Sequence, residues 1–352
     1  MQYELAQNLA SLGFFAPETV LVLSLLAVII ADLLAIKGVV QINSHALTLG
    51  GLALCFATVL NTPHGVPESQ FLFHGMITAD AYSQFFKIIF LACGVFLLWM
   101  SYGSPEIDAK TEPEYHTILL AMVLGLFLMA ASTDFLMIYL SLEFVSILSY
   151  VVAGLQPREP RAREAALKYV VFGGAASGIM LYGISLLYGI TGTTNLLEMR
   201  AAMEGTEPGL MHLLAIAIML VGFGYKIAAA PFHMWAPDVY EGSPTPVTAF
   251  FSVAPKAAGF AVLVRVFATW FADVGDLGLF GDKVAQLIGI MAIATMIIGN
   301  LGAVFQSNIK RFLAYSSIAH AGYLLMGVAL LPSLSTKAEA ADGIRAILIY
   351  MV

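Results

Sequence analysis

Long apolar stretches follow one another along almost the whole chain, and they constrain the fold more than any other feature of the sequence. A transmembrane helix needs about 20 consecutive apolar residues, and such windows recur from residue 17 to residue 331. Apolar residues make up 60% of the chain and charged residues only 11%. This composition excludes a soluble domain of comparable size. It predicts an all-α polytopic membrane protein whose core is the helix bundle itself.

Ten complete transmembrane helices and the start of an eleventh are expected. The ten cover about residues 17–36, 45–61, 80–102, 115–131, 134–154, 164–190, 210–230, 247–270, 284–305 and 311–331. Ser132, Thr133 and Asp134 are expected to supply a turn and an N-cap for the fifth helix. Residues 344–352 resemble the start of the eleventh, but nine residues at about 1.5 Å each cannot cross a bilayer. On this interpretation the chain is a fragment, or another polypeptide completes the bundle.

Basic residues in short loops predict the orientation, because such loops face the cytoplasm. Three arginines lie between residues 158 and 163, and Lys310 and Arg311 lie between the ninth and tenth helices. The loops at 62–80 and 272–283 are acidic or neutral. We therefore expect both basic loops on the cytoplasmic side and the N-terminus on the other side.

Several classes of site have no recognisable motif in the sequence. Cys55 and Cys93 are isolated, without a C-x-x-C motif or a His/Cys cluster, so we expect no iron–sulfur, haem or zinc site and no cofactor in this chain. The first sixteen residues contain Glu4 and no basic residue, which does not fit a cleaved signal peptide. The net charge of -7 is spread over loops, and no nucleic-acid partner is expected.

Two lysines lie inside or at the ends of apolar helices in the stretch from Gly222 to Lys256. Lys226 interrupts a run that is otherwise apolar from residue 213 to residue 231. A charge at the centre of a membrane costs about 2.5–3.5 kcal/mol on insertion scales, and ionisable groups there are functional by default. The alternative is that both lysines extend to an interface.

A proline lies close to each of these lysines and removes a helical hydrogen bond. Pro231 has no N–H group, so the carbonyl of Ile227 loses its donor, and Pro255 does the same to Phe251. Irregular backbone at membrane depth persists only where it is buried in protein or lines a wet cavity. Two lysines beside two breaks therefore predict a hydrated intramembrane site.

The fifth helix carries one polar face, formed by Tyr139, Glu143, Ser146 and Tyr150 at steps of four, three and four residues. Glu143 is a natural counter-charge for Lys226. Desolvation disfavours either charge alone, whereas a pair allows both to persist. Separating the pair would release a proton from the lysine, and re-pairing would favour its return. The alternative is a static ion pair that fixes the helix register.

Other polar groups have open interpretations. Lys168 begins the sixth helix near the cytoplasmic arginines, so an interfacial position and a functional role are both open. His320 and His233 could pass protons or could be satisfied structural histidines. His116 is assigned no role, and Lys87 is expected at an interface. The small residues of the sixth helix predict close packing; they are Gly173, Gly174, Ser177 and Gly178.

Together these residues predict a path for protons or cations through the bundle. Its core would be Glu143, Lys226 and Lys256, with Lys168 and His320 as possible extensions. The sequence shows no phosphate loop, nucleophile triad or redox ligand set that would favour another chemistry.

Two long blocks of the sequence carry a family resemblance. They are GYKIAAAPFHMWAPDVYEGSPTPVTAFFSVAPKAAGFAVLVR and SNIKRFLAYSSIAHAGYLLMG. The chain resembles the antiporter-like membrane subunits of respiratory complex I, of the subunit N type of bacterial NADH:quinone oxidoreductase. The wider family includes subunits of sodium/proton antiporters.

This resemblance implies fourteen helices with two inverted five-helix repeats, helices 4–8 and 9–13, in which helices 7 and 12 are broken. Residues 1–114 would form helices 1–3, residues 115–270 the first repeat, and residues 271–352 an incomplete second repeat. Helices 12–14, with the lysine of helix 12, have no counterpart in this sequence. By position, Glu143 resembles the family's glutamate of helix 5, and Lys226 its lysine of helix 7. Lys256 and Lys168 resemble its lysines of helices 8 and 6, and His320 falls where related chains have a histidine in helix 10.

The resemblance also implies a function. The chain would be a proton-translocating subunit of the bacterial inner membrane that works with other membrane and peripheral subunits. Flavin (FMN), iron–sulfur clusters and quinone would belong to those partners. The alternatives are a sodium/proton antiporter of the Mrp type, a membrane-bound hydrogenase subunit, and a structural bundle that does not pump.

Overall fold

The structure is a bundle of α-helices. The computed structural model describes residues 11–36, 43–62, 72–108, 110–204, 208–271, 278–333 and 337–351. Its helices are α2 Ala16–Ile36, α3 Ser44–Asn61, α4 Ala81–Ser101, α5 Glu112–Ala131, α6 Phe135–Ala153, α7 Pro160–Thr191, α8 Leu196–Glu204, α9 Leu210–Ile227, α10 Trp235–Gly242, α11 Thr245–Phe271, α12 Gly278–Val304, α13 Ile309–Leu330 and α14 Lys337–Met351, with a 3₁₀ turn at Leu331–Ser333. Ten helices in the described ranges are long and apolar enough to cross a membrane. The prediction of an all-α polytopic membrane protein is confirmed.

Local sequence signals account for where helices begin and end. Asp134 caps α6 as expected, because its side chain accepts a hydrogen bond from the Leu136 N–H at 2.8 Å. Helix α7 begins at Pro160, whose missing N–H costs nothing at a first position. It ends before Gly192, which has a φ of 74°, a conformation that glycine adopts without strain.

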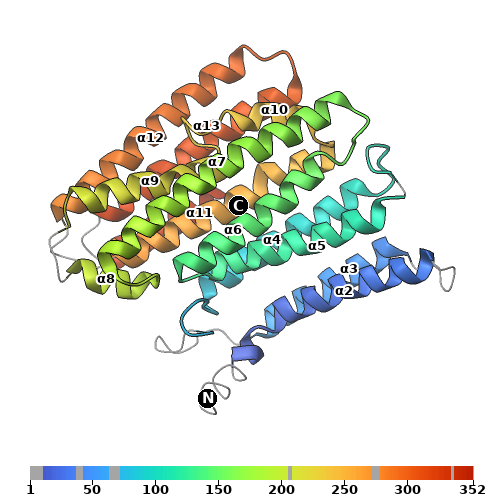
Figure 1. The fold of residues 1–352 in the computed structure, drawn as a ribbon, viewed down its shortest axis with the longest axis horizontal. Helices are drawn as coiled ribbons and strands as arrows, with labels where there is room; N and C mark the ends of the chain where they lie inside the picture. The colour runs from blue at the N-terminus through green and yellow to red at the C-terminus, as the bar shows by residue number, and fades with distance from the viewer. Residues whose placement is uncertain are drawn as a thin grey trace.

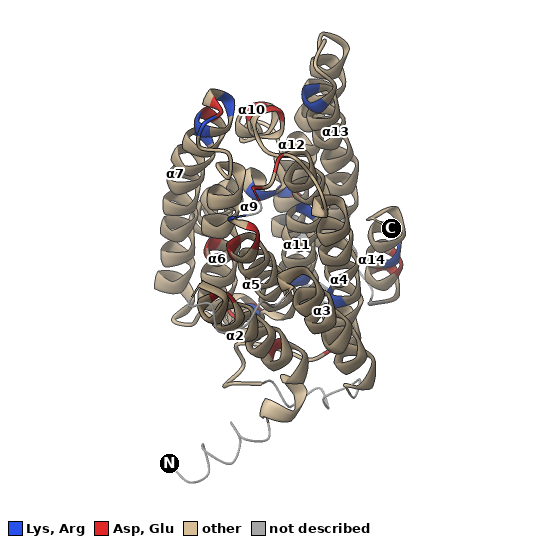
Figure 2. Cartoon of the chain, turned by 90° about the vertical axis from the view of Figure 1, so that its right-hand side faces the viewer, with Lys and Arg blue, Asp and Glu red and all other residues tan. Residues whose placement is uncertain are grey.

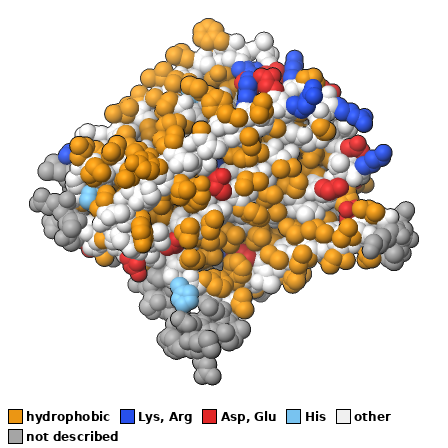
Figure 3. Space-filling model, viewed as in Figure 1, with side chains coloured by type: hydrophobic (Ala, Val, Ile, Leu, Met, Phe, Trp, Pro, Cys, Tyr) orange, Lys and Arg blue, Asp and Glu red, His pale blue; other side chains and the backbone are white. Residues whose placement is uncertain are grey.

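Helix α11 is the centre of the bundle (Figure 1). In its most apolar window 83% of residues are buried, against 17% for α2 and 22% for α12. Figure 1 shows α2 and α3 along one edge and α12 on the opposite side. The face in Figure 3 is largely apolar, and most of its basic side chains gather at one corner. An apolar surface around a buried polar interior is what a bilayer requires.

The two basic loops meet at the same end of the bundle, as predicted. Figure 2 shows charged residues at the ends of α7, α10 and α13. Arg161 lies 3.4 Å from Glu241, and Arg311 contacts the same carboxylate at 3.2 Å. One acidic residue of α10 therefore joins the first turn of α7 to the first turn of α13.

Several boundaries differ from the prediction. Helix α9 ends at Ile227 rather than near 230, and residues 235–242, expected within a linker, form α10. Helix α8 was not predicted, because it is amphipathic and too short to appear as a span. Helix α14 begins at Lys337 rather than 344. Lys37, His64 and Val352 lie outside the described residues.

Lys87 is the clearest correction among the charged residues. Its side chain is only 7% exposed, and its ammonium lies 2.6 Å from the Glu18 carboxylate. The expectation of an interfacial lysine is therefore wrong. A buried ion pair instead links α4 to α2, and a pattern search on α4 alone could not find its partner because Glu18 is far away in sequence.

Only part of the glycine pattern in α7 serves close packing. A Cβ at Gly173 would lie 1.9 Å from the hydroxyl of Tyr150, whereas Gly174 and Gly178 have open space around them. The tightest approach to a neighbouring backbone is at Gly183, where a Cβ would lie 2.4 Å from the Met219 nitrogen of α9. Gly183 therefore sets how closely α7 and α9 can approach.

We predict that Gly183→Ala destabilises the bundle and that Gly178→Ala, on the same helix, does not. The added methyl at 183 has to push backbone apart, which costs about 1–3 kcal/mol. The detergent-solubilised full chain would be heated to a series of temperatures, and the folded fraction that remains would be measured by size-exclusion chromatography. The unfolding midpoints of the two variants would show the difference. Equal midpoints for the two variants would contradict this account of the α7–α9 contact.

Candidate functional site

The chain is broken between α9 and α10, and this break is buried inside the protein. Ala228, which follows α9, has a φ of 58°, and it is fully buried. Backbone groups that lose their helical partners at the break are bonded to neighbouring elements instead. The Ala230 N–H donates to Thr295 Oγ1 at 2.9 Å. The indole of Trp235 donates to the carbonyl of Tyr225, also at 2.9 Å. The break predicted around Pro231 is thus present and satisfied by protein.

Lys226 ends in the interior, one residue before this break. Its side chain is 2% exposed, and its Nζ donates a hydrogen bond of 3.0 Å to Ser146 Oγ on α6. Neither lipid nor bulk solvent reaches the ammonium, so the snorkelling alternative does not describe this lysine. The polar face expected on α6 does turn toward α9.

The direct ion pair expected between Glu143 and Lys226 is not formed. Ser146 takes the ammonium instead, and the Oε1 atom of Glu143 is buried without a hydrogen-bond partner in the described part of the chain. Ser177 of α7 lies beside this carboxylate. Since Ser146 follows Glu143 by three residues, the two residues share one face of α6, with their Cα atoms about 4.5 Å apart along the helix axis.

Lys256 occupies a second buried position, on α11. It is 5% exposed, and its Nζ donates to Ser317 Oγ on α13 and lies 5.6 Å from the ring centre of Tyr240. The ring face adds a cation–π attraction that partly replaces lost hydration. A serine from another helix therefore holds each of the two buried lysines.

Pro255 does not break α11, contrary to the prediction. The helix runs without interruption through the proline. The carbonyl of Phe251, which loses its helical donor, accepts a hydrogen bond of 3.2 Å from the hydroxyl of Tyr240. Tyr240 therefore satisfies the backbone at the proline and also contacts the Lys256 ammonium.

The side-chain stem of Lys226 packs against α11 close to the backbone of Lys256, through the contact of α9 with α11. A Cβ at Gly259 would lie 3.5 Å from Cγ of Lys226 and 2.7 Å from the side chain of Ile227. Gly259 follows Lys256 by less than one helical turn. The absence of a side chain there lets the stem of Lys226 pack against the turn of α11 that begins at Lys256.

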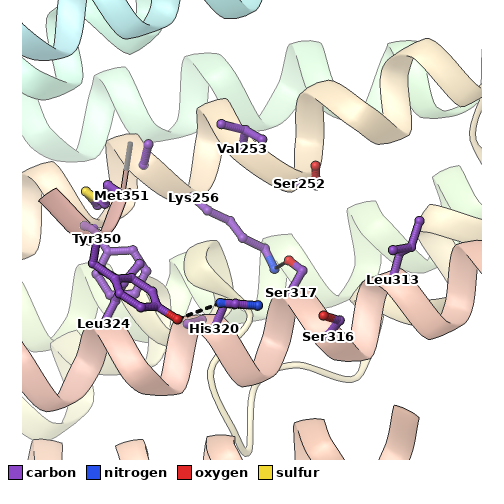
Figure 4. Close-up of a pocket in the computed structure, with 13 residues that line it drawn as sticks. Ser252, Val253, Lys256, Leu313, Ser316, Ser317, His320, Leu324, Tyr350 and Met351 are labelled. Carbon is purple, nitrogen blue, oxygen red and sulfur yellow. Dashed lines mark hydrogen bonds between the residues drawn. The ribbon is translucent and has the colours of Figure 1, made fainter. Parts of the chain in front are cut away.

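A cavity of about 360 Å³ opens beside Lys256 (Figure 4). Its polar lining includes Ser316, Ser317 and His320, which follow one another along α13. The His320 Nδ1 atom lies 2.7 Å from the hydroxyl of Tyr350 on α14. The cavity is large enough for several waters and has polar partners for them. It brings His320 together with Lys256, as the sequence suggested.

Lys168 lies elsewhere, in the charged cluster at the end of the bundle. Its ammonium contacts Asp238 at 2.5 Å and Glu164 at 2.6 Å, and its side chain is 36% exposed. Asp238 also accepts a hydrogen bond from Arg311. Lys168 is therefore not brought together with Glu143 and Lys226.

His233 lies in the break between α9 and α10 and is half-buried. Its Nδ1 atom is buried without a partner in the residues that the structure describes.

Three residues of this site escaped the sequence analysis. Tyr240 and Asp238 belong to α10, which appeared from the sequence to be a linker, and Ser317 is one of two adjacent serines with no distinguishing local signal. The proximity of α10 to Lys256 and Lys168 arises from the fold. The broken seventh helix was the only signal that could have pointed to them.

Comparisons with known proteins agree with this arrangement. Residues 132–352 match the family described as NADH:quinone oxidoreductase/Mrp antiporter, transmembrane. NADH-quinone oxidoreductase subunit N of Anaeromyxobacter sp. (strain Fw109-5) is 42% identical over 98% of this chain and 68% of its own length. Subunit N 2 of Sorangium cellulosum (strain So ce56) is 45% identical over all of this chain and 70% of its own length.

Solved structures show the same fold. A chain of respiratory complex I from Thermus thermophilus superposes with a TM-score of 0.71 at 30% identity, over 95% of this chain and 69% of that chain. A chain of the Mrp complex from Dietzia sp. DQ12-45-1b gives a TM-score of 0.73 at 23% identity, over 100% of this chain and 62% of that chain, and supports the fold alone. The chain thus belongs to the NADH:quinone oxidoreductase/Mrp antiporter membrane family, in its NADH-quinone oxidoreductase subunit N branch.

Proposed function

We propose that this chain translocates protons as a membrane subunit of an NADH:quinone oxidoreductase. One observation carries the proposal: two lysines on adjacent helices are almost fully buried, and each donates a hydrogen bond to a serine of another helix. Buried amines can lose and regain protons at modest cost because desolvation has already removed much of the preference for the charged form. The relatives named NADH-quinone oxidoreductase subunit N support the choice of enzyme.

In the proposed mechanism the ammonium of Lys226 exchanges between two partners on α6. Bonded to Ser146, as in this structure, it faces a neutral acceptor. Moved to Glu143, it would pair with a carboxylate and hold its proton more strongly. Driving the lysine away from Glu143 would therefore favour transfer of its proton toward Lys256, and from there into the cavity beside His320.

The energy of separating a buried ion pair is comparable to the energy needed to move a proton against a membrane potential. Moving one charge across 100 mV takes about 2.3 kcal/mol. Separating a poorly solvated ion pair changes the energy by several kcal/mol. A displacement of Lys226 between its two acceptors therefore suffices to load or release a proton against a membrane potential of that order.

Electron transfer from NADH to quinone would take place in partner subunits that carry the flavin and iron–sulfur clusters. The energy released there would reach this chain as a movement of its helices. We place the charged end of the bundle, with Lys168, Asp238 and Arg311, at the cytoplasmic face of a bacterial inner membrane, following the rule for basic loops. That orientation puts the N-terminus on the opposite side, and it makes the cluster a candidate for the proton uptake side.

We predict that Lys226→Met, in an assembly that still forms, lowers proton flux through this chain by about 100-fold, the scale expected when an acid–base group is removed. The variant keeps the length of the side chain but cannot carry a proton. Protons moved per NADH oxidised, measured in sealed vesicles with a pH-sensitive dye, would report the loss. Lys110→Met, which removes an exposed loop lysine, is the matched control.

Other outcomes would favour the alternatives. If Glu143→Gln and Lys226→Met both left the proton count per NADH unchanged, the chain would be a structural subunit. If vesicles without NADH showed sodium-dependent pH changes that Lys226→Met abolished, a sodium/proton antiporter would replace the redox-driven pump.

We also predict that Ser317→Ala slows proton transfer through Lys256 by about 10- to 100-fold. Loss of a hydrogen bond to a charged group costs about 1.5–3 kcal/mol, and each 1.4 kcal/mol corresponds to about tenfold in rate. Ser316→Ala changes a neighbouring serine that lines the same cavity without contacting the ammonium. Similar pumping rates for the two variants would remove Ser317 from the path.

A further inference from the structure

Three side chains from two helices converge at the bundle end where α3 and α5 begin. They are His45 of α3 and Glu112 and His116 of α5. One potential ligand atom from each residue lies within 4.8 Å of the other two. Glu112 and His116 are four residues apart, so they share one face of α5, and their Oε1 and Nε2 atoms are 3.8 Å apart. The proton path uses none of these residues.

The two histidines are held in place from their other sides. The His116 Nδ1 atom lies 3.1 Å from the hydroxyl of Ser44, which leaves Nε2 turned toward Glu112. A hydrogen bond at one ring nitrogen that leaves the other for a metal is the usual arrangement of a metal-binding histidine. His45 packs against the ring of Tyr102, with centroids 4.8 Å apart.

The cluster also contains an unsatisfied polar atom. The Nδ1 atom of His45 is buried, and no hydrogen-bond partner for it occurs in the ranges that the structure describes. Buried polar atoms without partners are uncommon, and a bound ion or water is one of the recognised reasons for them. This observation is independent of the convergence of the three side chains, and it points to a ligand between them.

We propose that His45, Glu112 and His116 bind one zinc ion. Two imidazoles and one carboxylate are a recognised donor set for zinc when a water completes the tetrahedron. Zinc–ligand bonds of about 2.0–2.2 Å place neighbouring donors about 3.3–3.5 Å apart. The pair from α5 is already close to that spacing, and side-chain rotation of His45 brings in the third donor. Magnesium and calcium, which prefer all-oxygen sites, fit this set poorly.

Bound zinc would join the beginning of α3 to the beginning of α5. The neighbouring loop connects this site to the rest of the bundle. Glu106 in this loop accepts hydrogen bonds from the backbone N–H of Thr245, at 2.6 Å, and from its hydroxyl. Thr245 begins α11, the helix that carries Lys256. A metal at the α3–α5 junction would therefore brace the same end of the bundle from which α11 starts.

The test compares zinc binding by the purified assembly that contains the full chain with binding by assemblies carrying His45→Gln or Glu112→Gln. Both residues are partly exposed, unlike the fully buried His116, so their variants are expected to fold. Glu114→Gln removes an exposed carboxylate two residues from Glu112 and is the matched control. Zinc is titrated against a chromophoric chelator, and the loss of a ligand is expected to weaken binding at one site per chain at least about tenfold.

Two results decide the proposal. It is supported if wild type and Glu114→Gln share one high-affinity site that both His45→Gln and Glu112→Gln weaken, with two histidine nitrogens in the zinc X-ray absorption spectrum. It is overturned if the three variants and the wild type bind the same amount of zinc with the same affinity. Neither result depends on proton pumping, so the proposed function is tested separately.

Discussion

Desolvation of two ammonium groups is the constraint on which this structure depends. Lipid cannot solvate Lys226 or Lys256, so the protein has to supply acceptors at the depth where each side chain ends. Ser146 of α6 and Ser317 of α13 are those acceptors. The hydrogen bond of Lys226 thereby links α9 to α6, and that of Lys256 links α11 to α13. The arrangement of the central helices is therefore tied to the positions of two charges.

The prolines impose a second requirement, which the same residues help to meet. Each proline leaves a carbonyl without its helical donor, and such a group is costly in a membrane. At Pro255 the hydroxyl of Tyr240 takes the place of the missing N–H. The ring of Tyr240 also faces the Lys256 ammonium. One side chain from α10 thus compensates for a backbone defect and a buried charge.

The sequence predicted the spans well, because hydropathy depends on local composition alone. It also predicted the polar face of α6, which follows from helical periodicity, and the burial of Lys226, which follows from the apolar run around it. It failed wherever the partner of a charge lies far along the chain. Glu18 for Lys87 and Ser317 for Lys256 are separated from their lysines by more than 60 residues, and only the fold pairs them. The predicted Glu143–Lys226 pair is not in direct contact in this structure, in which the hydroxyl of Ser146 accepts the hydrogen bond from the lysine.

The two serines that hold the lysines differ in a way that matters for proton transfer. The hydroxyl of Ser146 donates to the carbonyl of Leu142 at 2.8 Å while it accepts from Lys226. Because the hydroxyl hydrogen of Ser146 is already donated to this carbonyl, the serine can hold the ammonium but cannot pass a proton on without breaking that hydrogen bond. The hydroxyl of Ser317 lies beside another side chain, the hydroxyl of Tyr240, and it opens onto the cavity with His320. In the proposed mechanism, Ser146 would therefore suit a position where the charge waits, and Ser317 one where the proton leaves. This difference would give the proposed path a direction from α9 toward α13 that the two lysines alone would not supply.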